Sequence, residues 1–351
     1  MIETDQVLAD ARSPSLGGGR PVPVSLGIGR LAWRGRRPAL VLAGLVIIIV
    51  GCFGAYRYAR SYWVYRGFPP PSEPAFVQTV SKKGRPTHRV VVLRGTILKT
   101  NVWSTSLGGK WISTYVFLPP GYSDHPQRRY PVLYFLHGLH SAGFTYLTVL
   151  GGAVDEDVLV AEQRMKPMIV VIPSGPWRSD TEWADTARFG KWDTFVARDL
   201  VDAIDARFRT IPASDGRVIA GLSEGGYGAL NIGIHHPRIF GVIESWSGYT
   251  VADPSSGLFG TDGQTLAQNS PLYLLPSVPG TLREHHVFIY FYIGTLDPFF
   301  GQNVAFANEL TRFGIDHRFF DEDTGHLWRL WRRQMVPSLL VASEHVSDAV
   351  A

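Results

Sequence analysis

Residues 217–235 read RVIAGLSEGGYGALNIGIH and join a short apolar run to a helix-like stretch through a Gly-x-Ser-x-Gly sequence. In this context the pattern is typical of a nucleophile elbow, a sharp strand-to-helix turn on which a serine adopts a strained backbone. Gly221 and Gly225 suit such a turn, because a Cβ at either position would clash with the neighbouring strand or helix. We therefore predict that Ser223 is a nucleophile. The alternative interpretation is an ordinary glycine-rich turn.

The segments on either side of this stretch predict the rest of the fold. Continuous apolar runs, as expected of strands buried on both faces, occur at residues 132–136, 168–172, 240–244 and 287–293. Helical spacing is clearest at 192–208, and two further strands are predicted at 88–93 and 111–118. This alternation predicts an α/β domain over residues 76–345, with a mostly parallel central sheet flanked by helices. Functional side chains should then lie at the carboxyl ends of the strands.

A serine hydroxyl needs a base to take its proton, and the base needs an acid to orient it. Asp297 follows the apolar run at 287–293, and His326 follows a later strand-like segment. Ser, Asp and His in this chain order are typical of an α/β-hydrolase. The acids at 321–323 are alternatives to Asp297, but the orienting acid usually arrives from a loop separate from that of the histidine. We predict a catalytic triad of Ser223, Asp297 and His326.

The same reaction needs N–H donors for the oxyanion that forms on the substrate carbonyl. We predict that the backbone amides of Glu224, directly after the nucleophile, and Leu139, in the loop after the 132–136 strand, supply them. His137 and His140 lie on either side of Leu139 but have no third ligand nearby in the sequence. We therefore predict no metal and no cofactor, and we expect His137 to bond to the backbone and shape the loop.

The N-terminal part of the chain predicts attachment to a membrane. Residues 1–37 have the composition of a flexible tail, and residues 38–56 form an apolar segment between arginines and aromatic residues. Such flanks are typical of a transmembrane helix. A proline-rich spacer at 57–75 then leads to the main domain. The excess of arginine before the segment places the tail in the cytoplasm and the domain outside the cell membrane.

Three interpretations of the apolar segment remain open. It is an uncleaved transmembrane anchor, a cleaved secretory signal, or the signal of a lipoprotein whose first residue is Cys52. The lipoprotein interpretation rests on the Ile49-Val50-Gly51-Cys52 sequence, although the apolar character continues beyond the cysteine. All three interpretations place the main domain outside the cytoplasm.

The composition excludes several classes of protein. Charged residues make up 18% of the 351 residues and aromatic residues 12%, which excludes a mainly disordered chain. The formal net charge of +4 comes from scattered arginines, so binding to nucleic acid is not predicted. One cysteine excludes a disulfide framework within the chain.

Taken together, these motifs resemble the esterase D family of α/β-hydrolases, which includes feruloyl and acetyl-xylan esterases, S-formylglutathione hydrolases and mycolyltransferases. The resemblance spans about residues 115–340. It is carried by VFLPPGY at 116–122, RYPVLYFLHG at 129–138, PMIVVIP at 167–173, AGLSEGGYGA at 220–229 and GHLWRLW at 325–331. It implies an α/β-hydrolase fold, Ser223 as nucleophile, Asp297 as acid, His326 as base, and the amides of Leu139 and Glu224 as oxyanion donors.

The chain departs from the family at one position in the site. The family usually carries Met after the serine, where this chain has Glu224. Two roles remain open for its carboxylate: it pairs with a basic residue and packs the elbow, or it forms part of an acidic rim that favours cationic substrates. The candidate substrate contacts are His140, Trp177, Trp183, Phe299 and Trp328, with core packing as the alternative for the tryptophans at 177 and 183.

The predicted function is that of a membrane-tethered, extracytoplasmic serine esterase that hydrolyses carboxylic esters through an acyl-enzyme. An ester of a cell-envelope lipid or polysaccharide is the candidate substrate. An acyltransferase, in which a sugar or envelope alcohol replaces water, shares the same site and remains an alternative. A catalytically silent envelope-binding protein is the alternative from another class, although it would have no need of the three triad residues.

Overall fold

The computed structural model describes residues 36–71, 76–82, 85–91, 94–175 and 181–349, and its central feature is an eight-stranded sheet. The strands lie in the order β12-β11-β10-β9-β5-β6-β4-β3. All neighbouring pairs from β6 to β12 are parallel, and β4 alone runs against the other seven strands. The strands are β3 (Thr96–Ser104), β4 (Lys110–Leu118), β5 (Val132–Leu136), β6 (Ile169–Pro173), β9 (Arg217–Leu222), β10 (Val242–Trp246), β11 (Phe288–Gly294) and β12 (His317–Glu322).

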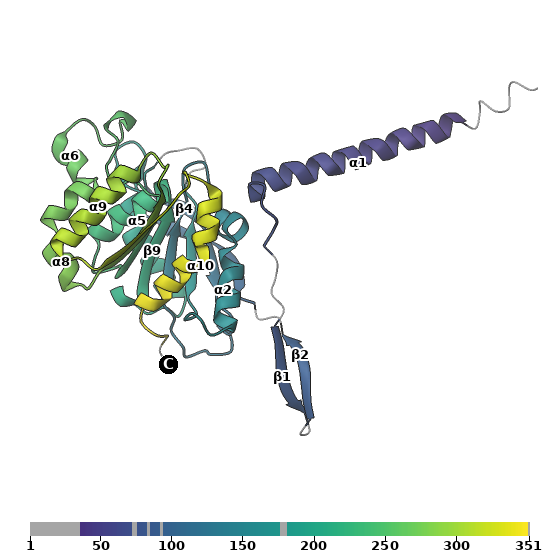
Figure 1. Ribbon diagram of the computed structural model, residues 1–351, viewed down its shortest axis with the longest axis horizontal. Coiled ribbons are helices and arrows are strands. Elements are labelled where there is room, and N and C mark those ends of the chain that lie inside the picture. The colour runs from purple at the N-terminus through teal and green to yellow at the C-terminus, as the bar shows by residue number, and fades with distance from the viewer. Residues whose placement is uncertain (1–35, 72–75, 83–84, 92–93, 176–180, 350–351) are drawn as a thin grey trace, which may run out of the picture. The chain divides into compact units, whose positions relative to one another are not determined.

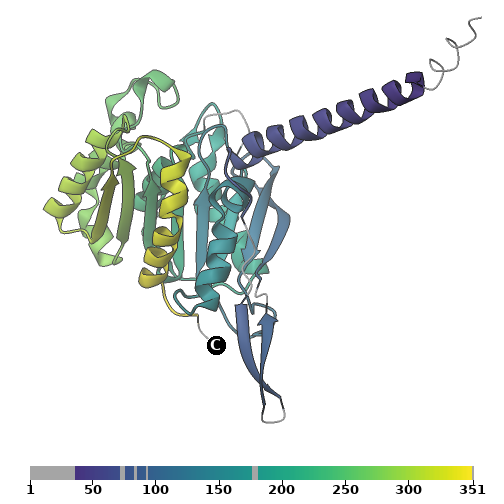
Figure 2. The same ribbon diagram turned by 45° about the vertical axis from the view of Figure 1, so that its right-hand side comes forward.

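Helices cover both faces of this sheet (Figure 1 and, in a turned view, Figure 2). On one face, α2 (Gly152–Ala161) and α10 (Trp328–His345) pack over a core that includes Phe135 and Trp246. On the other face, α4 (Val201–Arg207), α5 (Glu224–His235) and α9 (Phe300–Phe313) cover a core that includes Tyr134 and Phe291. Every residue of β5 is buried, which explains its continuous apolar run. The predicted α/β architecture with a mostly parallel sheet is therefore confirmed.

Shorter elements complete the main domain. The π-helical segment η1 (Tyr146–Leu150) precedes α2, and a second one, η2 (Phe195–Leu200), joins α3 (Trp192–Thr194) to α4. The helix predicted at 192–208 is therefore present over 192–207, with a π-helical middle. The remaining short elements are the hairpin β7 (Asp185–Thr186) and β8 (Gly190–Lys191), the helices α6 (Gly263–Gln268), α7 (Pro271–Leu274) and α8 (Pro279–Glu284), and the 3₁₀ turns η3 (Ser214–Gly216), η4 (Pro254–Ser256) and η5 (Leu275–Ser277).

Strand pairing at the start of the domain differs from the prediction. The segment predicted at 88–93 contributes to β2 (Arg85–Val91), which pairs with β1 (Phe76–Lys82) in a separate two-stranded sheet, and residues 92–93 lie outside the described residues. The partner of β4 in the main sheet is instead β3. Strand β3 was not predicted, because as an edge strand it leaves most of its side chains exposed and has no continuous apolar run.

The chain divides into two compact units, residues 1–58 and 59–351, and the helix α1 (Arg36–Tyr65) carries the apolar segment. Within the described residues, Pro38–Tyr65 is the one helix long and apolar enough to cross a membrane. Its most apolar stretch of 18 residues has a mean hydropathy of 2.5, and none of that stretch is buried. Residues 57–65, expected in the spacer, belong to this helix, because no glycine or proline interrupts it before Gly67. The predicted flexible tail at 1–37 lies almost wholly outside the described residues.

Candidate active site

Ser223 sits on a sharp turn between β9 and α5. Its φ of 55° and ψ of −119° lie outside the regions that L-residues ordinarily adopt, and such strain persists only where the surrounding structure enforces it. The two flanking glycines permit the turn: a Cβ on Gly221 would lie 2.2 Å from the Gly225 carbonyl oxygen, and one on Gly225 would lie 2.1 Å from the Leu136 carbonyl oxygen. The local sequence thus forces the serine out of the sheet at its carboxyl edge.

A continuous chain of hydrogen bonds joins Ser223, His326 and Asp297. The Nε2 of His326 lies 2.9 Å from the Ser223 Oγ, and its Nδ1 lies 2.6 Å from the Asp297 Oδ2. Asp297 is buried, and its other carboxylate oxygen accepts a hydrogen bond from the Phe299 amide at 3.0 Å. The three residues follow β9, β12 and β11, so the structure brings together side chains that lie up to 103 positions apart in the sequence.

Two aromatic rings fix the position of the His326 imidazole. Trp331 of α10 lies edge-on to it with 5.0 Å between ring centroids, and Phe299 lies edge-on at 6.0 Å. The Trp331 indole N–H donates to the Ser247 hydroxyl at 3.0 Å, which holds the indole in turn. The imidazole therefore has little freedom to rotate away from Ser223.

Leu139 follows β5 and lines the same hollow as Ser223. The loop that carries it is held by His137, which is buried. The His137 Nε2 accepts a hydrogen bond from the Gly175 amide at 2.9 Å, so its Nδ1 carries the proton and donates to the Gly138 carbonyl at 3.0 Å. Burial lowers the pKa of His137 to about 4, which keeps the ring neutral as this pattern requires. His137 thus shapes the loop through backbone bonds, as its surroundings in the sequence suggested.

The Glu224 carboxylate anchors a second loop beside the nucleophile. Its Oε1 accepts hydrogen bonds from the amides of Thr181 and Glu182 at 3.1 and 3.0 Å and from the Thr181 hydroxyl at 3.3 Å. The next residue, Trp183, donates its indole N–H to the His137 carbonyl at 3.0 Å. Glu224 is thereby connected, through residues 181–183, to the loop that carries Leu139.

Strained backbone gathers in this region. His140, Glu182, Trp183, Ser223 and Ser247 all adopt a positive φ between 51° and 55°, which is rare for residues with a side chain. His140 follows β5, Glu182 and Trp183 follow β6, Ser223 follows β9, and Ser247 follows β10. Residues held in this way occur preferentially at functional sites, where neighbouring bonds stabilise a conformation that is unfavourable on its own.

A hollow of about 470 Å³ opens beside Ser223. The sequence predicted only some of the residues that line it, namely Leu139, Glu224 and Phe299 beside Ser223. It did not predict Glu182, Gln302 or the residues of the loop after β10. The lining comprises Leu139, Glu182, Ser223, Glu224, Tyr249, Val251, Ala252, Asp253, Pro254, Phe299 and Gln302. The position of Tyr249, shortly after a strand next to the nucleophile strand, was the available signal, since strand ends meet at this edge.

Gln302 and two tyrosines give the hollow a firm wall. The Gln302 side-chain oxygen accepts from the amides of Thr250 and Val251 at 2.8 and 3.1 Å, which fixes the loop after β10. Tyr249 stacks on Tyr227 with 4.6 Å between centroids and an interplanar angle of 10°. The wall next to the nucleophile is therefore aromatic and rigid.

The other candidate substrate contacts lie elsewhere. Trp183 is only 1% exposed and packs edge-on against His137 and Trp192, so the structure places it in the core. His140 and Trp328 lie outside the lining of the hollow beside Ser223: the His140 carbonyl accepts from Arg66, whose guanidinium also lies over the Trp328 ring. Trp177 lies outside the described residues. Among the residues that the structure describes, no group of three or more His, Cys, Asp or Glu side chains could hold a metal ion.

Comparison with known proteins gives one family. The family described as "Putative esterase" matches residues 104–341. An endo-1,4-beta-xylanase/feruloyl esterase of Xylanibacter ruminicola is 31% identical over 168 residues, which cover 46% of this chain and 23% of that protein. An esterase of Mycobacterium tuberculosis is 33% identical over 143 residues, which cover 38% of this chain and 28% of that protein. The chain thus spans about a quarter of the length of these relatives.

The fold is shared with solved structures. A ferulic acid esterase superposes with a TM-score of 0.64 at 24% sequence identity, over 72% of this chain and 99% of that one. At this level of identity the likeness concerns the fold alone. It confirms the α/β-hydrolase-like arrangement described above.

Proposed function

The chain belongs to the putative esterase family, and from this premise we propose that it hydrolyses carboxylic esters with Ser223 as nucleophile, His326 as base and Asp297 as orienting acid. The observation that carries the proposal is the hydrogen-bonded chain from the Ser223 Oγ through the imidazole to a buried carboxylate. A serine hydroxyl is a weak nucleophile by itself, and this arrangement is the one that activates it.

The geometry supports a complete cycle. His326 Nε2 takes the hydroxyl proton as Ser223 Oγ attacks the ester carbonyl, and Asp297 stabilises the imidazolium that forms. The tetrahedral intermediate collapses when the C–O bond of the alcohol breaks and the imidazolium returns its proton to the leaving oxygen. Water then attacks the acyl-enzyme by the same route and releases the acid. Atoms and charges balance without any cofactor.

The backbone amides of Glu224 and Leu139 are proposed as the donors to the oxyanion. Glu224 is the first residue of α5, and the first N–H groups of a helix have no acceptor within the helix itself. The positive end of the helix dipole adds to the stabilisation of negative charge at this point. Leu139 lines the same hollow as Ser223, which supports the same role for the Leu139 amide.

The test is labelling and turnover of the full-length protein in detergent. Wild type should hydrolyse a p-nitrophenyl ester and react with a fluorophosphonate probe, whereas Ser223→Ala should do neither. Ser277→Ala is the matched control, because this exposed hydroxyl bonds only to the Leu274 carbonyl in a surface turn. Undiminished labelling of Ser223→Ala would refute the nucleophile assignment.

We further propose that α1 tethers the enzyme to a membrane with the catalytic domain outside the cytoplasm. The apolar Pro38–Tyr65 helix and the arginines on its N-terminal side support this topology. A protease added to spheroplasts should degrade the domain, and its protection would contradict the orientation. Release of a Cys52→Ala variant from the membrane would favour a lipoprotein over a helical anchor.

A further inference from the structure

The hairpin of β3 and β4 presents two tryptophans to solvent. Trp103 is 46% exposed and Trp111 is 62% exposed, whereas Trp183 and Trp246 are fully buried. The two residues are directly opposite in the antiparallel register, and their rings lie 5.1 Å apart at 60°. Contiguous exposed aromatic surface is costly in water and usually marks a binding site.

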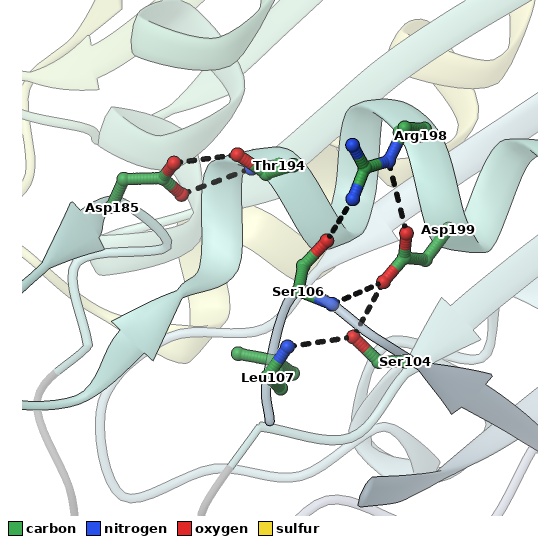
Figure 3. Close-up of polar contacts among 7 residues, drawn as sticks. All are labelled: Ser104, Ser106, Leu107, Asp185, Thr194, Arg198 and Asp199. Atoms are coloured by element: carbon green, nitrogen blue, oxygen red, sulfur yellow. Dashed lines mark hydrogen bonds and ion pairs between the residues drawn. The ribbon is translucent and has the colours of Figure 1, made fainter. Parts of the chain in front are cut away.

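Hydrogen bonds to residues of η2 hold the turn of the hairpin in place (Figure 3). The Asp199 Oδ2 of η2 accepts hydrogen bonds from the Ser104 hydroxyl at 2.7 Å and the Ser106 amide at 2.9 Å. Arg198 donates to the Ser106 hydroxyl at 2.8 Å, and the Leu107 side chain is buried in the main core. The turn between the two strands is therefore fixed before any ligand arrives, which lowers the entropic cost of binding on the adjoining rings.

The tryptophan pair is one end of a longer strip on the same face of the hairpin. Because side chains alternate along a strand, the next pairs on this face are Asn101 opposite Ser113 and Lys99 opposite Tyr115. The Lys99 ammonium lies over the Tyr115 ring at 5.6 Å, which places these two side chains on one face. At about 3.3 Å per residue, the strip from position 103 to position 99 is roughly 13 Å long. Aromatic and hydrogen-bonding groups alternate along it.

The strip lies on the catalytic edge of the sheet. The last residue of β6, Pro173, pairs with Thr114, so Trp111 lies beyond the carboxyl end of β6, the edge at which Ser223 also lies. Four strand spacings separate β9 from β3 in the order β9-β5-β6-β4-β3. At about 4.8 Å per spacing, Trp103 on β3 lies roughly 19 Å laterally from β9, and Trp111 on β4, three spacings away, lies roughly 14 Å from it. Only an extended ligand can contact both the hollow beside Ser223 and the tryptophan pair.

The charge of the strip indicates the charge of the ligand that it binds. Residues 96–118 contain no aspartate or glutamate, and their two lysines are Lys99 and Lys110. Lys99 lies on the strip, whereas Lys110, opposite Ser104, lies on the other face of the hairpin because side chains alternate along a strand. Asn101 and Ser113, in the middle, suit a partner rich in hydroxyl groups better than lipid hydrocarbon, where unpaired polar groups are costly. We propose that the β3–β4 strip binds an acidic polysaccharide, with sugar rings packed on the Trp103–Trp111 pair and a carboxylate near Lys99. Binding at this strip goes beyond ester hydrolysis and does not depend on it.

The experiment measures binding in the absence of turnover. The full chain carrying Ser223→Ala is placed in phosphatidylcholine nanodiscs, and its affinity is measured for polygalacturonate and for the same polymer with its carboxyl groups methyl-esterified. The Trp103→Ala/Trp111→Ala variant should bind polygalacturonate at least about tenfold more weakly, as expected for loss of aromatic anchors. Lys99→Gln should weaken binding and reduce its salt dependence. Tyr273→Ala, which removes a ring that is 57% exposed elsewhere, should change nothing.

Three results would overturn the proposal. The first is equal affinity for the charged and the esterified polymer, and the second is unchanged affinity in both the double tryptophan variant and Lys99→Gln. The third is tryptophan-dependent binding to phosphatidylglycerol vesicles without binding to polygalacturonate, which would make the strip a membrane contact. If the double tryptophan variant fails to fold, Trp111→Ala alone and the lysine variant decide, because both alter only exposed side chains. Hydrolysis of p-nitrophenyl esters by the same variants with Ser223 restored should equal that of wild type, so a failure of this proposal is distinguishable from a failure of the esterase assignment.

Discussion

Replacement of Glu224 tests how the site is held together. Glu224→Met restores the residue usual in the family but removes the acceptor of two backbone N–H groups and one hydroxyl. A buried donor that loses its partner costs about 1–3 kcal/mol. One of these donors is the amide of Glu182, whose φ is 52°, so the substitution also removes a bond that holds a strained backbone. We expect the free energy of unfolding to fall by about 2–4 kcal/mol.

Turnover should fall as well, because residues 181–183 support the loop that carries Leu139 through the bond from the Trp183 indole to the His137 carbonyl. We expect at least a tenfold loss of kcat, which corresponds to about 1.4 kcal/mol in the barrier. Glu224→Gln keeps a side-chain oxygen at this position and should lose less in both measurements. The assays are chemical unfolding and p-nitrophenyl ester hydrolysis of the full chain in detergent.

The anchoring contacts of Glu224 in the structure and the acidic rim considered from the sequence predict different results. If the carboxylate is an anchor, Glu224→Met should slow an ester with a free α-amine and its acetylated counterpart by the same factor. If it selects cationic substrates, only the preference for the amine should disappear while stability is kept. A Met variant as stable and as active as wild type, or a Gln variant as damaged as the Met variant, would refute the anchoring argument.

Three further predictions concern other parts of the domain. Asp297→Asn should reduce turnover by about 10⁴-fold, because the imidazole of His326 loses its orientation and correct tautomer; unchanged turnover would move the acid to residues 321–323. Burial raises the pKa of Glu244 to about 8, so the folded state holds a proton that the unfolded state releases at lower pH, and stability should fall as pH rises from about 5 to 8. Chemical unfolding at several pH values should give wild type a slope steeper than that of Glu244→Gln by up to about 1.4 kcal/mol per pH unit. Gly221→Ala should destabilise the fold by about 3 kcal/mol or more, because its Cβ would lie 2.2 Å from the Gly225 carbonyl oxygen; a soluble, active variant with a wild-type unfolding midpoint would contradict this.

The sequence predicted the features that local pattern determines. The run at 132–136 is β5 residue for residue, and α5 follows the elbow as expected. Chain order and strand ends were enough to select Asp297 and His326, and the structure brings both to Ser223. Parallel strands buried on both faces leave a clear apolar signal, and the residues after them must converge on one edge.

The features that could not be predicted from the sequence depend on contacts between distant segments. Nothing in the pattern around Trp183 distinguishes a buried indole bonded to the His137 carbonyl from a substrate contact, because both use an aromatic ring in a loop. The same holds for Glu224, whose partners at 181–182 lie more than 40 positions away. In edge strands such as β3, apolar and polar residues alternate only weakly, since only one side of the strand and part of one face are packed.

The strand order also has a consequence for how the chain folds as it is made. The central strand β5 pairs with β6 on one side and with β9 on the other, and β9 ends about 86 residues after β5. A nascent chain can therefore close the β3–β4 hairpin early, but its apolar β5 keeps an open edge until Leu222 has emerged. After that point β10, β11 and β12 add outward one at a time in chain order. We expect chains arrested before residue 217 to be aggregation-prone and sensitive to protease, and chains arrested after residue 246 to be much less so. The period of greatest vulnerability in biosynthesis thus ends with the arrival of the strand that leads directly to the nucleophile.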